Sequence, residues 1–227
     1  MIRVTENLRK IRDLLAISAV EAERDPETVR LLAVTKKQPL DKILAAASMG
    51  QRDFGENTVQ EGVDKILAAT ESGLTWHFIG HLQSNKTRAV AENFDWVHSI
   101  DKLKVAKRLS QQRPTSLPPL NVCLQVNIDE EPGKSGISID EAPELAAACM
   151  ELSQIRLRGL MCLPRIRQEF ADQRRPFARL RQLADALRDM GIDTDTLSMG
   201  MSADFRAAIF EGATIVRIGT AIFGERT

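Results

Sequence analysis

The amino-acid sequence predicts an α/β fold, a single closed (β/α)8 barrel of the TIM type over residues 1–227 with an extra helix at its N-terminus. Short apolar segments alternate with amphipathic segments along the chain, which is typical of a parallel sheet with helices between its strands. Several apolar segments are almost continuous, as expected of strands covered on both faces. Eight such units in 227 residues favour a closed barrel. An open doubly wound sheet is the competing architecture.

An amphipathic helix is predicted first, over residues 3–22, because Val4, Leu8, Ile11 and Leu15 recur at helical spacing. Eight strands follow, most of them short apolar segments: Arg30–Lys36, Asp53–Asn57, Thr75–Gly80, Trp96–Ile100, Asn121–Ile128, Arg156–Leu163, Thr196–Met199 and Thr214–Ile218. The helical patterns between them are Leu40–Met49, Val59–Ala69, Ser84–Glu92, Lys102–Gln111, Asp140–Glu151, Gln168–Met190 and Ala203–Glu211. No eighth covering helix is predicted after the last strand, so we expect the N-terminal helix to fill that place in the outer ring.

The composition excludes several classes of protein. Lys plus Arg and Asp plus Glu both number 31, whereas a nucleic-acid-binding protein normally has a basic excess. No apolar run reaches the roughly 18 residues of a membrane span, and the first residues lack the apolar core of a signal peptide; we therefore expect a cytoplasmic protein. Three cysteines without a CxxC pair and three histidines without an HExxH pair predict neither a disulfide scaffold nor a metal site. Few aromatic residues give no clear interface stripe, and we expect a monomer.

A lysine follows the first predicted strand. In a parallel barrel the active face lies at the carboxyl ends of the strands, and Lys36 comes directly after the apolar residues 31–34. Burial lowers the pKa of a lysine by disfavouring its charged form, and a neutral amine attacks an aldehyde to form a Schiff base. The alternative is a solvated lysine just beyond a strand end.

The loops after the last two strands predict a phosphate site. They contain residues 198–202 and 217–220, and in (β/α)8 barrels this pair of loops frequently binds phosphate. Glycine lets the backbone approach an anion closely, and Ser202 and Thr220 add hydroxyl donors. We expect Ser202 to begin the helix Ala203–Glu211, whose free N–H groups favour an anion. The alternative is that Ser202 only caps that helix.

Arg217 is the one charged residue between Val216 and Ile218 on the last strand, and we expect it to point into the barrel mouth. A buried guanidinium needs an acceptor because it keeps its proton. That acceptor is either a carboxylate from another strand or a ligand's ring nitrogen or oxygen. An amine for an aldehyde, a phosphate cup and a cation between them together predict a site for pyridoxal 5′-phosphate.

Long blocks of the sequence resemble the pyridoxal phosphate homeostasis protein family, also called the YggS family. The blocks are LLAVTKKQP (31–39), FGENTVQEGVDKI (54–66), WHFIGHLQSNK (76–86), LQVNIDEEPGKSG (124–136), LRGLMCLP (157–164) and LSMGMSADFRAAIFEGATIVRIGTAIFGER (197–226). The resemblance covers essentially the whole chain. It implies a fold similar to the N-terminal barrel of alanine racemase, with the cofactor bound as an internal aldimine of Lys36.

The resemblance also implies further site residues. Ser202, Gly219 and Thr220 match phosphate-binding positions, and Arg217 matches the arginine that faces the pyridine nitrogen. The residues implied on or near the cofactor wall are Asn57, Met201, Val34, His77 and Ile79. Three departures from the family pattern are Gln38 in place of a basic residue, Thr58 in place of tyrosine and His81 in place of proline.

The implied role is intracellular pyridoxal phosphate homeostasis without robust catalysis, with apo forms of pyridoxal phosphate enzymes as partners. The chain has no tyrosine, which argues against a racemase that uses a tyrosine as second base. An arginine beside the ring nitrogen keeps that nitrogen unprotonated and the ring a poorer electron sink. Three alternatives stay open: an amino-acid racemase that uses water or His77 as second base, a class I aldolase with Lys36 as its amine, and a partner-binding barrel with a vestigial site.

Overall fold

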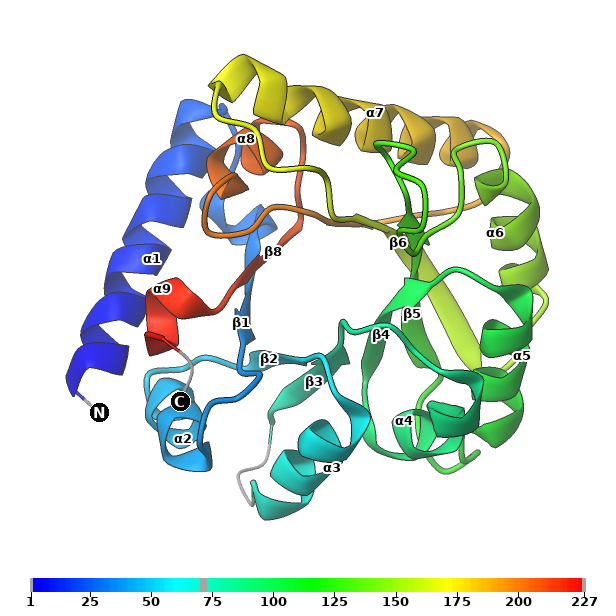
Figure 1. Ribbon diagram of the computed structural model, residues 1–227, viewed down its shortest axis with the longest axis horizontal. Helices are drawn as coiled ribbons and strands as arrows, with labels where there is room; N and C mark the ends of the chain where they lie inside the picture. The colour runs from blue at the N-terminus through cyan, green and yellow to red at the C-terminus, as the bar shows by residue number, and fades with distance from the viewer. Residues whose placement is uncertain (1, 70–72, 226–227) are drawn as a thin grey trace.

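Eight parallel strands close into a barrel in chain order, and β8 pairs with β1 (Figure 1). The computed structural model describes residues 2–69 and 73–225. The strands are β1 (Arg30–Val34), β2 (Asp53–Glu56), β3 (Thr75–Phe78), β4 (Trp96–Ile100), β5 (Leu120–Val126), β6 (Ile155–Cys162), β7 (Thr196–Ser198) and β8 (Ile215–Ile218). The closed (β/α)8 prediction is confirmed, and the open-sheet alternative is wrong.

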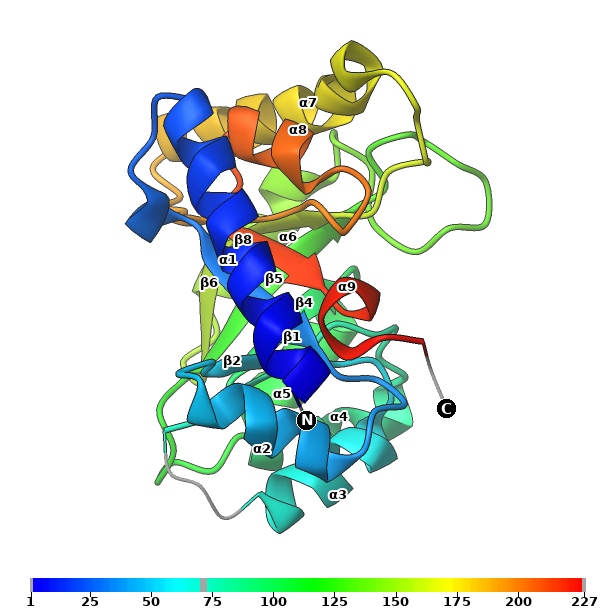
Figure 2. The ribbon, with the colours of Figure 1, turned by 90° about the vertical axis from the view of Figure 1, so that its left-hand side faces the viewer.

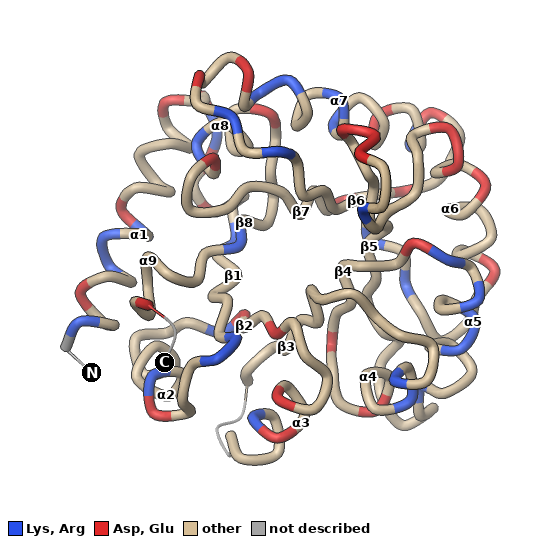
Figure 3. The backbone as a smooth tube through the Cα atoms, viewed as in Figure 1, with Lys and Arg blue, Asp and Glu red and all other residues tan. Residues whose placement is uncertain are grey.

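Helices surround the strands. They are α1 (Ile2–Glu21), α2 (Leu40–Ser48), α3 (Val59–Ala68), α4 (Thr87–Asn93), α5 (Leu103–Gln112), α6 (Ala142–Met150), α7 (Phe170–Asp189), α8 (Phe205–Phe210) and α9 (Thr220–Phe223), with 3-10 turns η1 (Pro26–Thr28) and η2 (Ser84–Lys86). Charged residues of both signs are interspersed over this outer layer (Figure 3). None of the helices within the described ranges combines the length and apolar character of a membrane span.

The N-terminal helix is part of the outer ring. It contacts α2, α8 and α9 and runs along the outside of the barrel next to α9 (Figure 2). The predicted apolar stripe faces inward, since Val4, Leu8, Ile11 and Leu15 are all buried. Asn7 adds a hydrogen bond from its side-chain amide to the Ile222 carbonyl, 3.1 Å away. The prediction that this helix takes the eighth place is therefore confirmed.

Two elements near the carboxyl ends of the strands differ from the prediction. The helix expected from Ala203 begins at Phe205, because the Asp204 carboxylate accepts the N–H of Met201 at 2.6 Å and makes a separate turn there. A short acidic side chain competes in this way with helical hydrogen bonding. The four-residue helix α9 after β8 was not predicted, because four residues carry too little periodicity to identify a helix.

The barrel interior holds a small apolar cluster next to a buried histidine. The cluster consists of Trp96, Cys123 and Met161, and the His77 ring stacks on Trp96 with centroids 5.3 Å apart. The three cysteines are free and buried, and burial raises the pKa of each thiol to about 12. They are small side chains that pack in the interior.

We expect Leu8→Ala to lower the free energy of unfolding by about 2–5 kcal/mol, because it leaves a cavity between α1 and the barrel. Leu14→Ala is the control on the same helix, since Leu14 is 47% exposed while Leu8 is 0% exposed; it should change stability by less than about 0.5 kcal/mol. Urea unfolding of both variants measures the difference. Equal effects would contradict the contribution of the buried Leu8 side chain to the packing of α1 on the barrel.

Candidate functional site

A cavity of about 580 Å³ opens at the carboxyl ends of the strands. All seven residues predicted as cofactor-binding line it: Lys36, Asn57, Met201, Ser202, Arg217, Gly219 and Thr220. They follow or end β1, β2, β7 and β8, which are consecutive neighbours around the barrel. The structure therefore brings the predicted set together on one arc of the barrel mouth.

Lys36 lies in the turn that follows β1, half-buried in the cavity wall. The neighbouring Lys37 is exposed and has a φ of 56°, in the left-handed region that a non-glycine residue enters at a cost. Its backbone N–H donates to Glu61 Oε1 at 2.5 Å. The α3 helix thus fixes the turn that presents Lys36.

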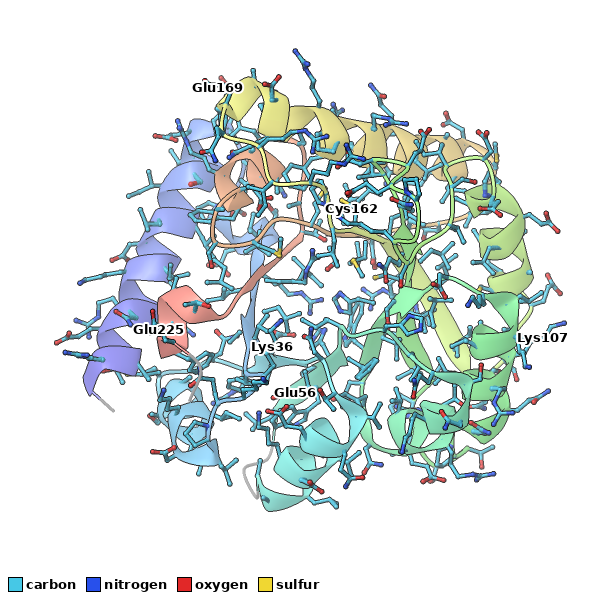
Figure 4. The ribbon with its side chains drawn as sticks, in the orientation of Figure 1. Lys36, Glu56, Lys107, Cys162, Glu169 and Glu225 are labelled. Carbon is cyan, nitrogen blue, oxygen red and sulfur yellow. The ribbon has the colours of Figure 1, made fainter. Side chains whose placement is uncertain are left out.

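A partly buried lysine strengthens this attachment. Lys65 Nζ donates to the Thr35 carbonyl at 2.6 Å and to Glu56 and Glu61 carboxylate oxygens at 2.7 Å each. Thr35 Oγ1 also donates to Glu56 Oε1 at 2.5 Å. We refer to Lys65, Glu56 and Glu61 as the Lys65 clamp. Glu56 and Lys36 lie at neighbouring strand ends (Figure 4), so the clamp holds the Lys36 turn from below.

Glu56 is the most deeply buried member of the clamp. Burial raises the pKa of its carboxyl, against the opposing effects of the hydrogen bonds from Lys65 and Thr35. Its second oxygen, Oε2, is buried and has no hydrogen-bond partner among the described residues. Sequence reasoning missed the clamp, although the Glu61–Lys65 spacing of four is the usual signal of an ion pair on a helix.

Asn57 extends the site on the other side of Lys36. Its Oδ1 atom is buried and lacks a hydrogen-bond partner within the part of the chain that the structure describes. An unpaired buried acceptor costs free energy unless a ligand donor meets it. Gly80 makes this placement possible, because a Cβ there would lie 1.9 Å from the Asn57 carbonyl oxygen.

The end of β8 approaches β1 closely. A Cβ on Gly219 would lie 2.9 Å from the Val34 carbonyl oxygen, so a larger residue would push β8 away from Lys36. Gly219 precedes α9, and Thr220 is its first residue. The first N–H groups of a helix have no partner within the helix, and here they adjoin the cavity.

Ser202 contributes differently from the prediction. It lines the cavity, but it is exposed in a turn and neither begins nor caps α8, whose N-cap is Asp204. The expected helix N-terminus at Ser202 is therefore wrong. The helix that begins at the cavity is α9, after β8.

The far end of α9 is tied to the loop and helix after Lys36. Lys42 Nζ donates to the Phe223 carbonyl at 2.9 Å and to Gln38 Oε1 at 2.8 Å. The Gln38 amide donates to the Gly224 carbonyl at 3.4 Å. Gln38, one of the departures from the family pattern, thus joins the Lys36 loop to α9.

Arg217 points into the barrel mouth, as predicted, and is only 4% exposed. Its Nη1 donates to the Ser198 carbonyl at 2.5 Å and to Ser198 Oγ at 2.7 Å, and its Nη2 donates to the Cys162 carbonyl at 2.8 Å. Burial lowers the pKa of this guanidinium. Among the described residues no carboxylate pairs with it, so the carboxylate alternative is wrong. A buried cation with only neutral partners favours an anion in the cavity.

His77 is the implied wall residue that the structure places elsewhere. Val34 and Ile79 line the cavity, whereas His77 is fully buried and bonds His98 and Asp53 at 2.9 Å each. His77 lies on β3 and Ile79 follows its last residue, and the two share a face because side chains alternate along extended chain. His77 is one layer deeper, inside the barrel, and does not line the cavity.

The opposite wall of the cavity comes mainly from β5, β6 and the loops after them. It consists of Gln125, Val126, Asn127, Lys134, Ser135, Met161, Leu163 and Pro164. His81 also lines the cavity, with its Nδ1 atom 3.3 Å from Ser135 Oγ. Sequence reasoning assigned no role to Lys134 or Ser135. Within residues 2–69 and 73–225 no cluster of acidic residues, histidines or cysteines is placed to hold a metal ion.

Comparisons with known proteins identify the family. Residues 4–227 match the model of the alanine racemase N-terminal domain. The pyridoxal phosphate homeostasis protein of Pseudomonas aeruginosa is 53% identical over 226 residues, which cover 100% of this chain and 97% of that protein. The chain belongs to the pyridoxal phosphate homeostasis protein family. The Escherichia coli K12 homeostasis protein is also 53% identical, over 98% of this chain and 97% of its own length.

Two solved structures of one protein have the same fold as this chain. PipY of Synechococcus elongatus PCC7942 without PLP superimposes with a TM-score of 0.87 at 37% identity, over 97% of this chain and 100% of that chain. The same protein with PLP bound gives a TM-score of 0.82 at 36% identity, with the same coverage. PipY thus shares the barrel of this chain over 97% of its length.

We expect Lys65→Met to lower the free energy of unfolding by about 3–5 kcal/mol at neutral pH, because it leaves the buried Glu56 carboxylate without its cation. Urea unfolding measures the loss. Lys107→Met, on the exposed face of α5, is the control and should be nearly neutral. Similar losses in the two variants would contradict a stabilising clamp.

The Lys65→Met deficit should also depend on pH. Burial raises the pKa of Glu56 above its unfolded value, so the stability that its proton contributes is present at low pH and is lost as the pH rises through the folded-state pKa. Removal of Lys65 raises that pKa further. The deficit should therefore shrink as the pH falls through the Glu56 pKa, and a deficit that is constant with pH in urea titrations would exclude Glu56 as its source.

Proposed function

We propose that the protein binds pyridoxal 5′-phosphate in this cavity through a Schiff base with the Lys36 amine, and that it takes part in intracellular pyridoxal phosphate homeostasis without robust catalysis of its own. The observation that carries the proposal is the gathering of Lys36, Arg217 and the start of α9 around one cavity. The PLP-bound structure of PipY and the names of the relatives support it.

The residues present fit the chemistry of this cofactor. Lys36 supplies an amine for its aldehyde. The hydroxyls of Ser202 and Thr220 and the first N–H groups of α9 supply donors for its phosphate. The unpaired Oδ1 of Asn57 supplies an acceptor for a hydroxyl donor. The buried Arg217 charge favours a ligand that brings negative charge.

The order of the strands makes these roles compatible. β8 lies next to β1, with Ala33 opposite Ile218, so the amine and the phosphate donors come from adjacent strand ends. Asn57 follows β2, on the far side of β1 from the phosphate donors. Gly219 and Thr220 would therefore hold the phosphate at the strand end next to the one that carries Lys36, and Arg217 on β8 lines the same cavity.

Two features of the cavity argue against efficient amino-acid catalysis. When bound, pyridoxal phosphate supplies an electron-withdrawing ring that stabilises charge at a neighbouring carbon. Arg217 only donates hydrogen bonds, so a ring nitrogen that faces it stays unprotonated and withdraws electrons less. His77, the second base of the racemase-like alternative, is buried beneath the cavity with both ring nitrogens bonded and does not line it.

A carrier has to release its ligand. The phosphate donors Ser202 and Thr220 are exposed at the rim, so water reaches the point where release begins. We propose apo forms of pyridoxal phosphate enzymes as recipients.

We also propose that the protein is cytoplasmic. Its buried cysteines are unpaired, which suits a reducing compartment.

Lys36→Ala should abolish covalent cofactor attachment. We expect the wild-type protein mixed with pyridoxal phosphate to become yellow, and borohydride to fix one cofactor per chain on Lys36, as measured by peptide mass spectrometry. Lys37→Ala is the matched control, because Lys37 is adjacent but exposed, and it should label like the wild type. Labelling of Lys37 instead, or trapping of a sugar phosphate in place of the cofactor, would reject the assignment, and the second result would favour the aldolase.

The carrier and racemase-like functions differ in proton exchange at Cα. We expect the holo-protein in D2O to exchange the Cα proton of amino acids no faster than free pyridoxal phosphate, because the arginine weakens the ring as an electron acceptor. NMR of a panel of L-amino acids measures the exchange. Exchange at rates typical of enzymes, about 1 s⁻¹ or more, would establish an enzyme and overturn the carrier function.

A further inference from the structure

A continuous line of hydrogen bonds crosses the barrel interior beneath the cavity. It runs from Arg217 on β8 to Ser198 on β7, then to His98 on β4, His77 on β3 and Asp53 on β2. The successive separations are 2.7 Å from Nη1 to Oγ, 2.8 Å from Oγ to Nδ1, 2.9 Å from Nε2 to Nδ1, and 2.9 Å from Nε2 to Oδ1. We refer to Ser198, His98, His77 and Asp53 as the interior chain.

Donor and acceptor accounting fixes the proton on each atom of the interior chain. The Asp53 carboxylate only accepts, so a neutral His77 has its proton on Nε2 and donates it to Asp53, which leaves His77 Nδ1 as an acceptor. A neutral His98 then has its proton on Nε2, which donates to His77 Nδ1. His98 Nδ1 therefore accepts the Ser198 hydroxyl proton, and Ser198 Oγ accepts from Arg217. The line has one direction, because both histidines are neutral and the Asp53 carboxylate can only accept.

The charges around the histidines agree with this arrangement. Ser198, His98 and His77 are 0% exposed, and burial lowers the pKa of both histidines. The acidic groups near them are Asp53 and Asp95, and the basic groups are Arg30 and Arg217. The carboxylate of Asp53 lies 3.6 Å from Arg30 Nη1. This ion pair anchors the Asp53 end of the interior chain near the base of the barrel.

We propose that His98 and His77 are positioning residues for Arg217. Their neutral Nε2–H forms turn the Ser198 hydroxyl proton toward His98, so that the lone pairs of Ser198 face the guanidinium. Arg217 is then held in one orientation at the floor of the cavity without a carboxylate. The inference rests on the proposed function, in which Arg217 donates to the ring nitrogen of bound pyridoxal phosphate.

A purely structural role is the competing explanation. An apolar filling of this space would avoid the cost of burying three polar side chains, and a buried polar network is stable only when every member is satisfied. The interior chain meets that condition in one proton arrangement only. The test therefore needs a measurement at the cofactor ring that loss of stability alone does not change.

His98→Gln and His98→Met separate the two explanations. A glutamine can accept from Ser198 and donate to His77, whereas methionine fills similar space without either bond. With pyridoxal phosphate labelled with 15N at the ring nitrogen, we expect His98→Met to change the 15N shift and to weaken cofactor binding by about 10- to 100-fold, as for a lost bond to a charged group. His98→Gln should restore both values toward those of the wild type.

Cys123→Ala is the matched control, because Cys123 is fully buried in the same barrel interior but lies outside the chain. It should lower stability and leave the ring 15N shift unchanged. A His98→Met variant with wild-type shift and affinity would overturn the positioning role. Wild-type protein that takes up no pyridoxal phosphate would overturn the proposed function, and the positioning role with it.

The unmodified protein offers a test that needs no variant. Long-range 1H–15N NMR of the histidine side chains should show His77 and His98 neutral with the proton on Nε2. An Nδ1–H form of either residue would overturn the proposal, even where His98→Met fails to fold.

Discussion

The parallel pairing of β1 with β8 is the constraint on which the cavity depends. Residues at the two ends of the sequence meet there, with Arg30 opposite Ile215 and Ala33 opposite Ile218. The pairing sets the amine-bearing turn of Lys36 beside the glycine and hydroxyl groups that follow β8. It tolerates no side chain at Gly219, where a Cβ would lie 2.9 Å from the Val34 carbonyl oxygen. A barrel left open at this seam would separate the two halves of the site.

Two charged side chains, Arg217 and Glu56, are buried next to the cavity. Arg217 lies inside the barrel among carbonyl and hydroxyl groups, and Glu56 lies under the Lys36 turn with one unpartnered oxygen. Each is a charge that low-polarity surroundings disfavour. Lys65 balances Glu56 within the protein, whereas Arg217 has no such partner among the described side chains and leaves the cavity receptive to anions. The asymmetry distinguishes a group that holds the scaffold from one that faces a ligand.

The sequence predicted the elements with strong periodicity and the residues at strand ends. Two of the seven cavity residues, Asn57 and Met201, entered through the family resemblance. The closed barrel, the stripe on α1 and the other five cavity residues follow from the apolar pattern and from the rule that parallel strands present their carboxyl ends together. The clamp of Lys65 and the interior chain did not, because both depend on which distant side chains meet across strands. His98 and Ser198 are 100 positions apart, and nothing local to either marks the pair. The start of α8 was misplaced because Asp204 favours a turn.

The short helix α9 is bonded at its carboxyl end to two parts of the chain far from it in sequence. Asn7 of α1 holds the Ile222 carbonyl, and Lys42 and Gln38, which adjoin the loop after Lys36, hold the carbonyls at its end. Any displacement of α9 therefore has to break its bonds to α1 and to the segment after Lys36. The hydroxyl-bearing side of the cavity and the amine-bearing side are mechanically coupled through this short helix.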